Sequence, residues 1–199
     1  MPPKSKFTRE QITQAALNIV REQGLEGLTA RALGKRLGSS ACPIGHGITC
    51  VADLENMEEV QQAVLEAAGA CYREYVERGL SEKLAFKGVG TQYILFAVEE
   101  PRLFQILFMS GRTGRADFEN VLPLIDESYE QILLSITAGY GLQETAAERL
   151  YRHLWIYTHG IAALCVTQTC CFTGEEISGM LTEVFSSLLK KIKEEKYDD

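Results

Sequence analysis

Cys42, His46 and Cys50 follow one another at intervals of four residues. On a continuous helix they would share one face, where two thiolates and an imidazole can bind a soft metal ion. Gly45 and Gly47 disfavour a continuous helix here, and no fourth ligand is evident. We therefore predict no metal site, and keep a thiol or metal sensor as one alternative function.

A second group of thiols lies near the C-terminus, at Cys165, Cys170 and Cys171. The adjacent pair would suit a redox sensor if one thiolate were exposed and activated. Neither cysteine has a basic neighbour in the sequence. We expect these side chains to be reduced and to pack in the core.

Aromatic residues are frequent in the C-terminal two thirds of the chain. Such a set can line a pocket for a small molecule, or it can simply fill a core, and both interpretations stay open. Two members, Trp155 and His159, are one helical turn apart and would share a face. The candidate pocket residues are Tyr93, Phe96, Phe104, Phe108, Tyr129, Trp155 and His159.

The sequence contains no motif typical of an enzyme. It has no glycine-rich phosphate loop, no nucleophile elbow and no His-Glu-x-x-His zinc motif. The acidic pairs Glu99–Glu100 and Glu175–Glu176 are adjacent, so their side chains diverge on a helix. We expect a protein that is not an enzyme and that has no cofactor.

The charge of the chain is unevenly distributed. The 199 residues include 20 basic and 27 acidic ones, with a formal net charge of -7. Residues 1–50 carry +4, because they contain seven Lys and Arg but only three Glu. The remainder therefore carries -11. This asymmetry indicates that the N-terminal part contacts a polyanion and that the rest has another role.

Residues typical of helix ends predict the helices that position the basic N-terminal residues. Thr8 and Gln11 form a capping box before an apolar helical face, and Gly24 follows as a residue suited to a positive φ. Thr29 can cap a second helix, which Gly38 ends. Ser39 or Ser40 can cap a third. Two helices joined by a tight turn are the order of a helix-turn-helix, whose last helix enters the DNA major groove.

The remaining elements are also predicted to be helical, and no segment alternates with a period of two, so the fold class is all-α. No stretch of about 18 apolar residues and no signal peptide is present, so we expect a cytoplasmic protein without a membrane segment. Helices are predicted over residues 57–79, 118–138 (with a kink at Pro123), 144–169 and 173–193. An apolar run at 93–98 begins another helix, and a further helix starts at Pro101. Thr173 and Glu176 form a second capping box before the last helix.

The N-terminal pattern resembles the DNA-binding domain of the tetracycline-repressor family. The residues that carry the resemblance are Ile12, Ala15, Ala16, Gly24, Leu28, Thr29, Leu33, Leu37, Gly38 and Ser40. The segment from Trp155 to His159–Gly160 is similar to a Trp-His-Gly motif of one subgroup. Together the two resemblances cover most of the chain.

The resemblance implies an N-terminal three-helix DNA-binding domain (1–56) and a helical effector-binding and dimerisation domain (57–199). The expected function is a repressor that binds double-stranded operator DNA and is released by a small-molecule effector. The last two long helices would pair in a homodimer. The implied DNA-binding residues are Thr29, Arg31, Lys35, Ser39, Ser40, Ala41, Cys42, Pro43 and His46.

Residues 45–54 depart from the family pattern. After Pro43–Ile44 the family usually has two aromatic residues and a short turn, but here both aromatics are missing and about six residues are extra. Gly34 also stands where the family prefers Ala. Altered operator recognition is one interpretation. The alternative is a helical dimer that binds a small molecule and has weakened or lost operator recognition.

Overall fold

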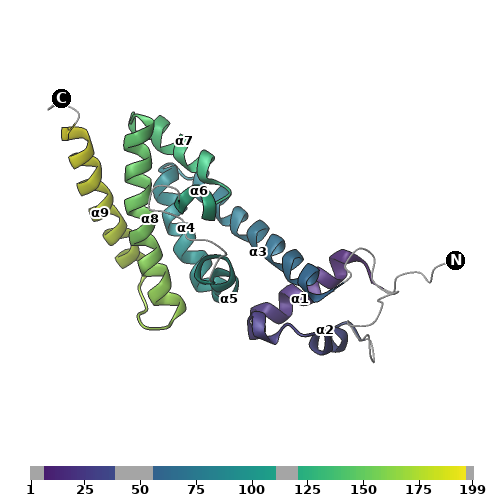
Figure 1. The fold of residues 1–199 in the computed structure, drawn as a ribbon. Helices are drawn as coiled ribbons and strands as arrows, with labels where there is room; N and C mark the ends of the chain where they lie inside the picture. Colours follow the sequence, from purple (N-terminus) through teal and green to yellow (C-terminus); the bar gives the residue numbers. More distant parts are fainter. Residues whose placement is uncertain (1–6, 39–55, 111–120, 196–199) are drawn as a thin grey trace. The chain divides into compact units, whose positions relative to one another are not determined.

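The computed structural model describes residues 7–38, 56–110 and 121–195, and its regular elements are helices (Figure 1). This confirms the all-α fold class. The elements are α1 (Arg9–Gln23), η1 (Leu25–Gly27), α2 (Ala30–Arg36), α3 (Met57–Leu80), α4 (Ala85–Glu99), α5 (Pro101–Phe104), η2 (Gln105–Met109), α6 (Val121–Ile125), α7 (Tyr129–Tyr140), α8 (Glu144–Val166) and α9 (Gly174–Glu195). None of these helices is long and apolar enough to cross a bilayer.

The chain divides into two compact units. The first comprises Met1–Cys71 and Glu100–Ser110, and the second comprises Tyr72–Glu99 and Gly111–Asp199. Helix α3 therefore begins in one unit and ends in the other. The functional boundary between residues 56 and 57 stays a prediction.

The first unit is organised around α1, which contacts η1, α2 and α5. Its predicted capping box is confirmed: the Thr8 hydroxyl accepts from the Gln11 amide at 3.2 Å, and the Gln11 side chain accepts from the Thr8 amide at 2.9 Å. Gly24 ends the helix with a φ of 75°, a backbone angle that disfavours other residues. Ile12 and Val20 are buried on the inner face.

Helix α2 also begins and ends as predicted. The Thr29 hydroxyl accepts from the Ala32 amide at 3.2 Å, and Gly38 follows the helix with a φ of 67°. Leu33 is buried, whereas Arg31 and Lys35 are exposed. The sequence therefore fixes α2 at both ends and directs its basic side chains outward.

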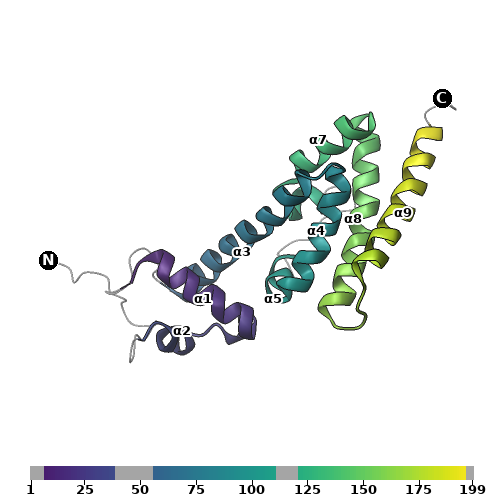
Figure 2. The ribbon, with the colours of Figure 1, turned by 180° about the vertical axis from the view of Figure 1, so that it is seen from behind.

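The second unit packs α4 and α9 against α8, with α7 alongside α4 and α8 (Figures 1 and 2). Its core contains fully buried side chains from these helices, including Phe96, Ile132 and Leu150. The predicted second capping box is present at the start of α9, where the Glu176 amide donates to the Thr173 hydroxyl at 3.2 Å. Gly141 ends α7 in the left-handed region, with a φ of 63°.

Helix α4 begins eight residues earlier than the apolar run at Tyr93 predicts. Gly88 and Gly90 lower the helix propensity of the segment that was missed. Close packing explains Gly88, because a Cβ atom added there would clash with the carbonyl oxygen of Gly79 at the end of α3. A Cβ atom added to Gly79 would in turn lie 2.6 Å from the Val89 nitrogen. The backbones of α3 and α4 approach each other too closely here for any side chain on Gly79.

We expect Gly79→Ala to destabilise the fold by about 2 kcal/mol, because the clash involves backbone atoms that cannot rotate away. Intrinsic helix propensity acts in the opposite direction but by at most about 1 kcal/mol. Thermal unfolding followed by circular dichroism measures the change. Gly139→Ala is the control, since nothing lies within 4 Å of a Cβ added there. An unchanged melting temperature for Gly79→Ala would contradict the packing explanation.

The prediction of one continuous helix over residues 118–138 is wrong. The structure has two helices, α6 and α7, separated by a turn at residues 126–128, and residues 111–120 lie outside the described part. The turn forms because the Asp126 carboxylate accepts from the Ser128 amide at 2.9 Å, a local bond that competes with helix.

Candidate functional site

A cavity of about 250 Å³ lies inside the second unit. Side chains from α3, α4, α8 and α9 form most of its wall, with Tyr140 of α7 and Asp126 completing it. The wall is mostly apolar or aromatic. The lining residues are Tyr72, Leu84, Phe86, Lys87, Val89, Gly90, Tyr93, Asp126, Tyr140, Tyr151, Leu154, Trp155, Thr158, Leu181, Thr182, Phe185 and Ser186.

Aromatic rings in this wall contact one another edge to face. Tyr72 and Tyr93 have ring centroids 5.9 Å apart, and Phe86 and Tyr151 have centroids 5.6 Å apart. Such pairs hold large rings in defined orientations. The cavity therefore has a preformed aromatic surface.

Asp126 is a buried carboxyl group in this wall, with a relative exposure of 3%. Its Oδ2 accepts from the Tyr72 hydroxyl at 3.0 Å and from the Tyr151 hydroxyl at 3.2 Å, and its Oδ1 accepts from the Ser128 amide. Burial raises the pKa of the Asp126 carboxyl above its ordinary value, and these hydrogen bonds oppose the increase. Asp126 thus links α3, α8 and the turn before α7 at one point.

The raised pKa of Asp126 predicts that the free energy of unfolding contributed by this residue falls as pH rises. The folded protein binds the proton more tightly than the unfolded chain does, so stability is lost between the ordinary carboxyl pKa and the raised value. Urea unfolding from about pH 4 to pH 7 should show a smaller loss in Asp126→Asn than in the wild type. Identical pH profiles for the two proteins would contradict this prediction. Burial lowers the pKa of His159, whose contribution has the opposite sign but is common to both proteins.

Trp155 and His159 share a helical face, as predicted, and their rings stack with centroids 5.0 Å apart. The Tyr93 hydroxyl and His159 Nδ1 share a hydrogen bond of 2.9 Å. The lowered pKa of His159, caused by burial, favours a neutral imidazole. The Trp155 indole Nε1 is buried and interacts with the Tyr93 hydroxyl, but it forms no hydrogen bond of full geometry with a described residue.

Lys87 is the basic residue of the cavity wall. Its half-buried ammonium group donates to the Ser178 and Thr182 hydroxyls of α9, each at 3.0 Å. Among the described residues no carboxylate lies within ion-pair distance of it. Two neutral oxygens therefore hold this cation in place.

The structure brings together some of the predicted pocket residues. Tyr93 and Trp155 line the cavity, and His159 contacts both of them. Tyr129 stacks on the lining residue Tyr151, and its hydroxyl donates to Glu148 at 2.7 Å.

Three other predicted pocket residues lie outside the cavity wall. Phe96 is fully buried against Tyr72 and Tyr75. Phe104 and Phe108 contact each other in the first unit, with ring centroids 5.1 Å apart. That Phe96, Phe104 and Phe108 contact an effector stays a prediction, and their positions outside the cavity wall do not support it.

Sequence reasoning missed Tyr72, Phe86, Lys87, Asp126 and Tyr151. A usable signal existed for Tyr151, because it precedes Trp155 by one turn on the same helix. Asp126 offered a weaker signal as an acidic residue directly after the apolar run of α6. The others are brought to the cavity by contacts between distant segments, which the sequence pattern does not reveal.

The predicted DNA-binding residues fall into two groups. Thr29, Arg31 and Lys35 are described: Thr29 caps α2, and both basic side chains are exposed without an ion pair among the described residues. Arg36 of the same helix instead pairs with Glu22. The remaining members, Ser39, Ser40, Ala41, Cys42, Pro43 and His46, lie outside the described residues.

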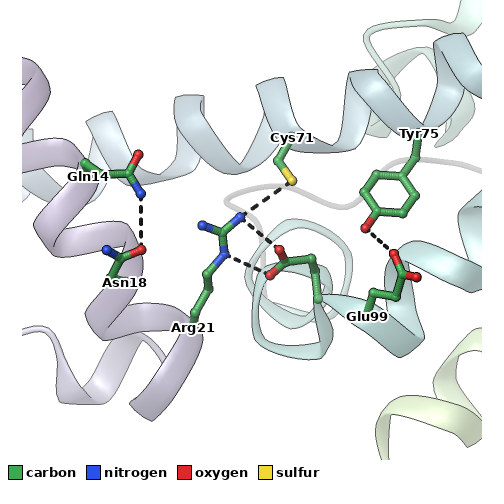
Figure 3. Close-up of polar contacts among 7 residues, drawn as sticks. Gln14, Asn18, Arg21, Cys71, Tyr75 and Glu99 are labelled. Carbon is green, nitrogen blue, oxygen red and sulfur yellow. Dashed lines mark hydrogen bonds and ion pairs between the residues drawn. The ribbon is translucent and has the colours of Figure 1, made fainter.

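A charged cluster joins α1 to the start of α5 within the first unit (Figure 3). The Arg21 guanidinium makes a two-point contact with the Glu100 carboxylate, at 2.9 Å from Nε and 2.8 Å from Nη2. The same guanidinium donates to Cys71 Sγ at 3.9 Å. Bidentate contacts of this kind fix orientation as well as charge.

The described thiols do not favour a sensor. No cluster of three or more metal-binding side chains exists in residues 7–38, 56–110 and 121–195. Cys42, His46 and Cys50 lie outside this part. The expectation of core packing is wrong for Cys171, which is exposed. Burial raises the pKa of the Cys165 thiol, which lowers its reactivity.

Comparison with protein families matches most of the second unit, together with α5 and η2. A family model described as the tetracyclin repressor-like C-terminal domain matches residues 86–187, just over half of the chain. The match spans the helices that build most of the cavity wall. No curated protein and no solved structure matches the chain. The match does not reach the N-terminal residues that carry the resemblance, and the Trp-His-Gly subgroup stays a prediction. The match confirms the family: the chain belongs to the tetracycline-repressor family of regulators.

Proposed function

We propose that the protein is a sequence-specific DNA-binding transcriptional repressor that a small-molecule effector releases from its operator. The observation that carries this proposal is the aromatic cavity inside the repressor-like domain. Apolar pockets with a few oriented polar groups are typical of small-molecule sites. No enzymatic activity is proposed.

The first unit supplies the proposed DNA contacts. Thr29 lies at the N-terminus of α2, where backbone amides and the helix dipole favour a phosphate, and Arg31 and Lys35 add positive charge. Ser39, Ser40, Ala41, Cys42, Pro43 and His46 follow in the segment proposed to reach base edges and phosphates. A basic N-terminal part with an acidic remainder would orient this end toward DNA.

We propose a homodimer formed through α8 and α9. Ile156 and Leu164 are exposed, at 46% and 40%, and Gly160 lies between them at a spacing of four residues. These three residues form one stripe of α8. A small residue flanked by apolar side chains permits close packing of a second helix. The stripe therefore supports the pairing of equivalent helices from two protomers.

An effector would act by changing the arrangement of the two DNA-binding units in the dimer. It can do so only by binding one arrangement more tightly than the other. The cavity suits this role because α3 passes from its wall into the first unit. Ligand contacts on Tyr72 would thus act on a helix that both units share.

A gel-shift experiment with the full-length protein and the DNA flanking its own gene tests the proposal. A specific complex should form at low salt and survive an excess of unrelated DNA. A protein that stays dimeric but shows no sequence-specific complex would overturn the repressor function. That result would favour the alternative of a small-molecule-binding dimer with lost operator recognition, caused by residues 45–54.

A further inference from the structure

The unsatisfied hydrogen-bonding groups of the cavity indicate the chemical class of its ligand. Several polar groups are already satisfied within the protein: Tyr72 and Tyr151 donate to Asp126, and Thr158 donates to the Leu154 carbonyl at 2.7 Å. Asp126 also accepts from the Ser128 amide. The polar groups that can still form a hydrogen bond therefore say more about the ligand than the whole cavity wall does.

Lys87 is the first such group. An ammonium group has three N–H donors, and the structure gives two of them to the neutral oxygens of Ser178 and Thr182. A ligand that fills the cavity would remove further water from this half-buried cation. Such desolvation is unfavourable unless the ligand supplies a compensating negative charge.

The indole of Trp155 is the second group. Its Nε1 is a donor only and is buried, and it interacts with the Tyr93 hydroxyl without forming a hydrogen bond of full geometry. Buried donors normally have a well-formed hydrogen bond, so an acceptor atom of a ligand would satisfy this one better. Both nitrogen donors of the wall therefore suit an acceptor atom, and Lys87 also favours a negative charge.

The rest of the wall sets the size and polarity of the ligand body. Phe86, Leu154, Leu181 and Phe185 give it an apolar surface. The cavity volume of about 250 Å³ exceeds the roughly 150 Å³ that suffices to hold benzene. A chain of about ten carbons or a one- to two-ring body is therefore suitable.

From these contacts we infer that the effector is an organic carboxylate with an apolar body, whose negatively charged end is bound by Lys87. This inference rests on the proposed role of the cavity as the effector site. A cation would be repelled by Lys87, and the Asp126 carboxylate that would attract it already accepts three hydrogen bonds. A neutral ligand would leave Lys87 without a countercharge.

Intrinsic fluorescence of the full-length protein tests the inference directly, because Trp155 is the single tryptophan of the chain and lines the cavity. The probes are decanoate, decan-1-ol and decylammonium, which share one chain length, each used below its micelle concentration. We expect decanoate to bind about tenfold or more tightly than either other probe near pH 7.5.

Charge variants separate recognition by Lys87 from nonspecific binding. Lys87→Met should reduce decanoate affinity about tenfold while leaving decan-1-ol affinity unchanged. Lys83→Met is the matched control, since Lys83 is an exposed lysine that does not line the cavity. It should change neither affinity. Circular dichroism melting of both variants shows whether each remains folded.

Three results would overturn the inference. They are equal or tighter binding of decylammonium, decan-1-ol binding as tight as decanoate with no effect of Lys87→Met, and no binding of any probe. These binding measurements need no DNA, so their outcome is distinct from that of the gel shift. Specific DNA binding released by the amine or alcohol, but not by decanoate, would retain the proposed repressor and reject the carboxylate.

Discussion

Replacing both Arg31 and Lys35 with alanine is expected to weaken operator binding by a factor of about 100 or more near 0.15 M salt. Both side chains are exposed on α2 and neither has an ion-pair partner among the described residues. In the proposed homodimer the change removes four positive charges from the DNA-facing surface. The slope of log affinity against log salt should therefore decrease by about 4 if all four neutralise phosphates.

Arg36→Ala is the matched control for this variant. It also removes a positive charge from α2, but the Arg36 guanidinium already pairs with Glu22. We expect its effect on operator affinity to be several times smaller per charge removed. Fluorescence anisotropy with a labelled operator duplex at several salt concentrations measures both variants. A salt slope unchanged by Arg31→Ala/Lys35→Ala would contradict the assignment of α2 to the DNA interface.

Asp126→Ala should destabilise the folded protein by about 3 kcal/mol. The truncation removes the common acceptor of two buried hydroxyl groups, those of Tyr72 and Tyr151, and the acceptor of the Ser128 amide. Each buried donor left without a partner costs about 1–3 kcal/mol. The loss should exceed that from removing an exposed carboxylate. Urea unfolding followed by circular dichroism measures it.

Two further variants locate the origin of this effect. Glu127→Ala removes the adjacent, exposed carboxylate, which pairs with Arg73 at the surface, and should cost less than about 1 kcal/mol. Tyr72→Phe with Asp126→Ala should cost less than the sum of the two single changes, because the unpaired hydroxyl is gone. Additive losses would show that the Tyr72–Asp126 hydrogen bond does not couple these residues.

Local signals in the sequence predicted helix ends well. The capping residues Thr8, Thr29 and Thr173 and the terminal residues Gly24 and Gly38 all act as expected, because each signal depends on groups only a few residues apart. A Ser or Thr hydroxyl three residues before a backbone amide is enough to predict a helix N-cap.

Contacts between distant segments were not predictable in this way. Asp126 and Tyr72 are 54 residues apart, yet their hydrogen bond joins two parts of the cavity wall. Gly79 is explained only by the backbone of α4. The sequence pattern gives the apolar face of a helix, but it does not specify which polar side chain of another helix meets it.

The family resemblance contributed what periodicity alone did not. An aromatic set at helical spacing is equally consistent with a core and with a pocket, and the structure contains both: Trp155 lines the cavity, whereas Phe96 is fully buried. Only the three-dimensional arrangement separates these two environments. The matched domain at residues 86–187 then relates the cavity to a regulatory role.

The most direct test of the proposed repressor is the specificity of DNA binding by the intact dimer. Fluorescence anisotropy should compare a duplex from the region flanking its own gene with a scrambled duplex of the same composition, over a series of salt concentrations. We predict that the flanking duplex binds about a thousandfold or more tightly, with affinity falling steeply as salt increases. Equal affinity for the two duplexes, with the dimer intact, would contradict the central claim.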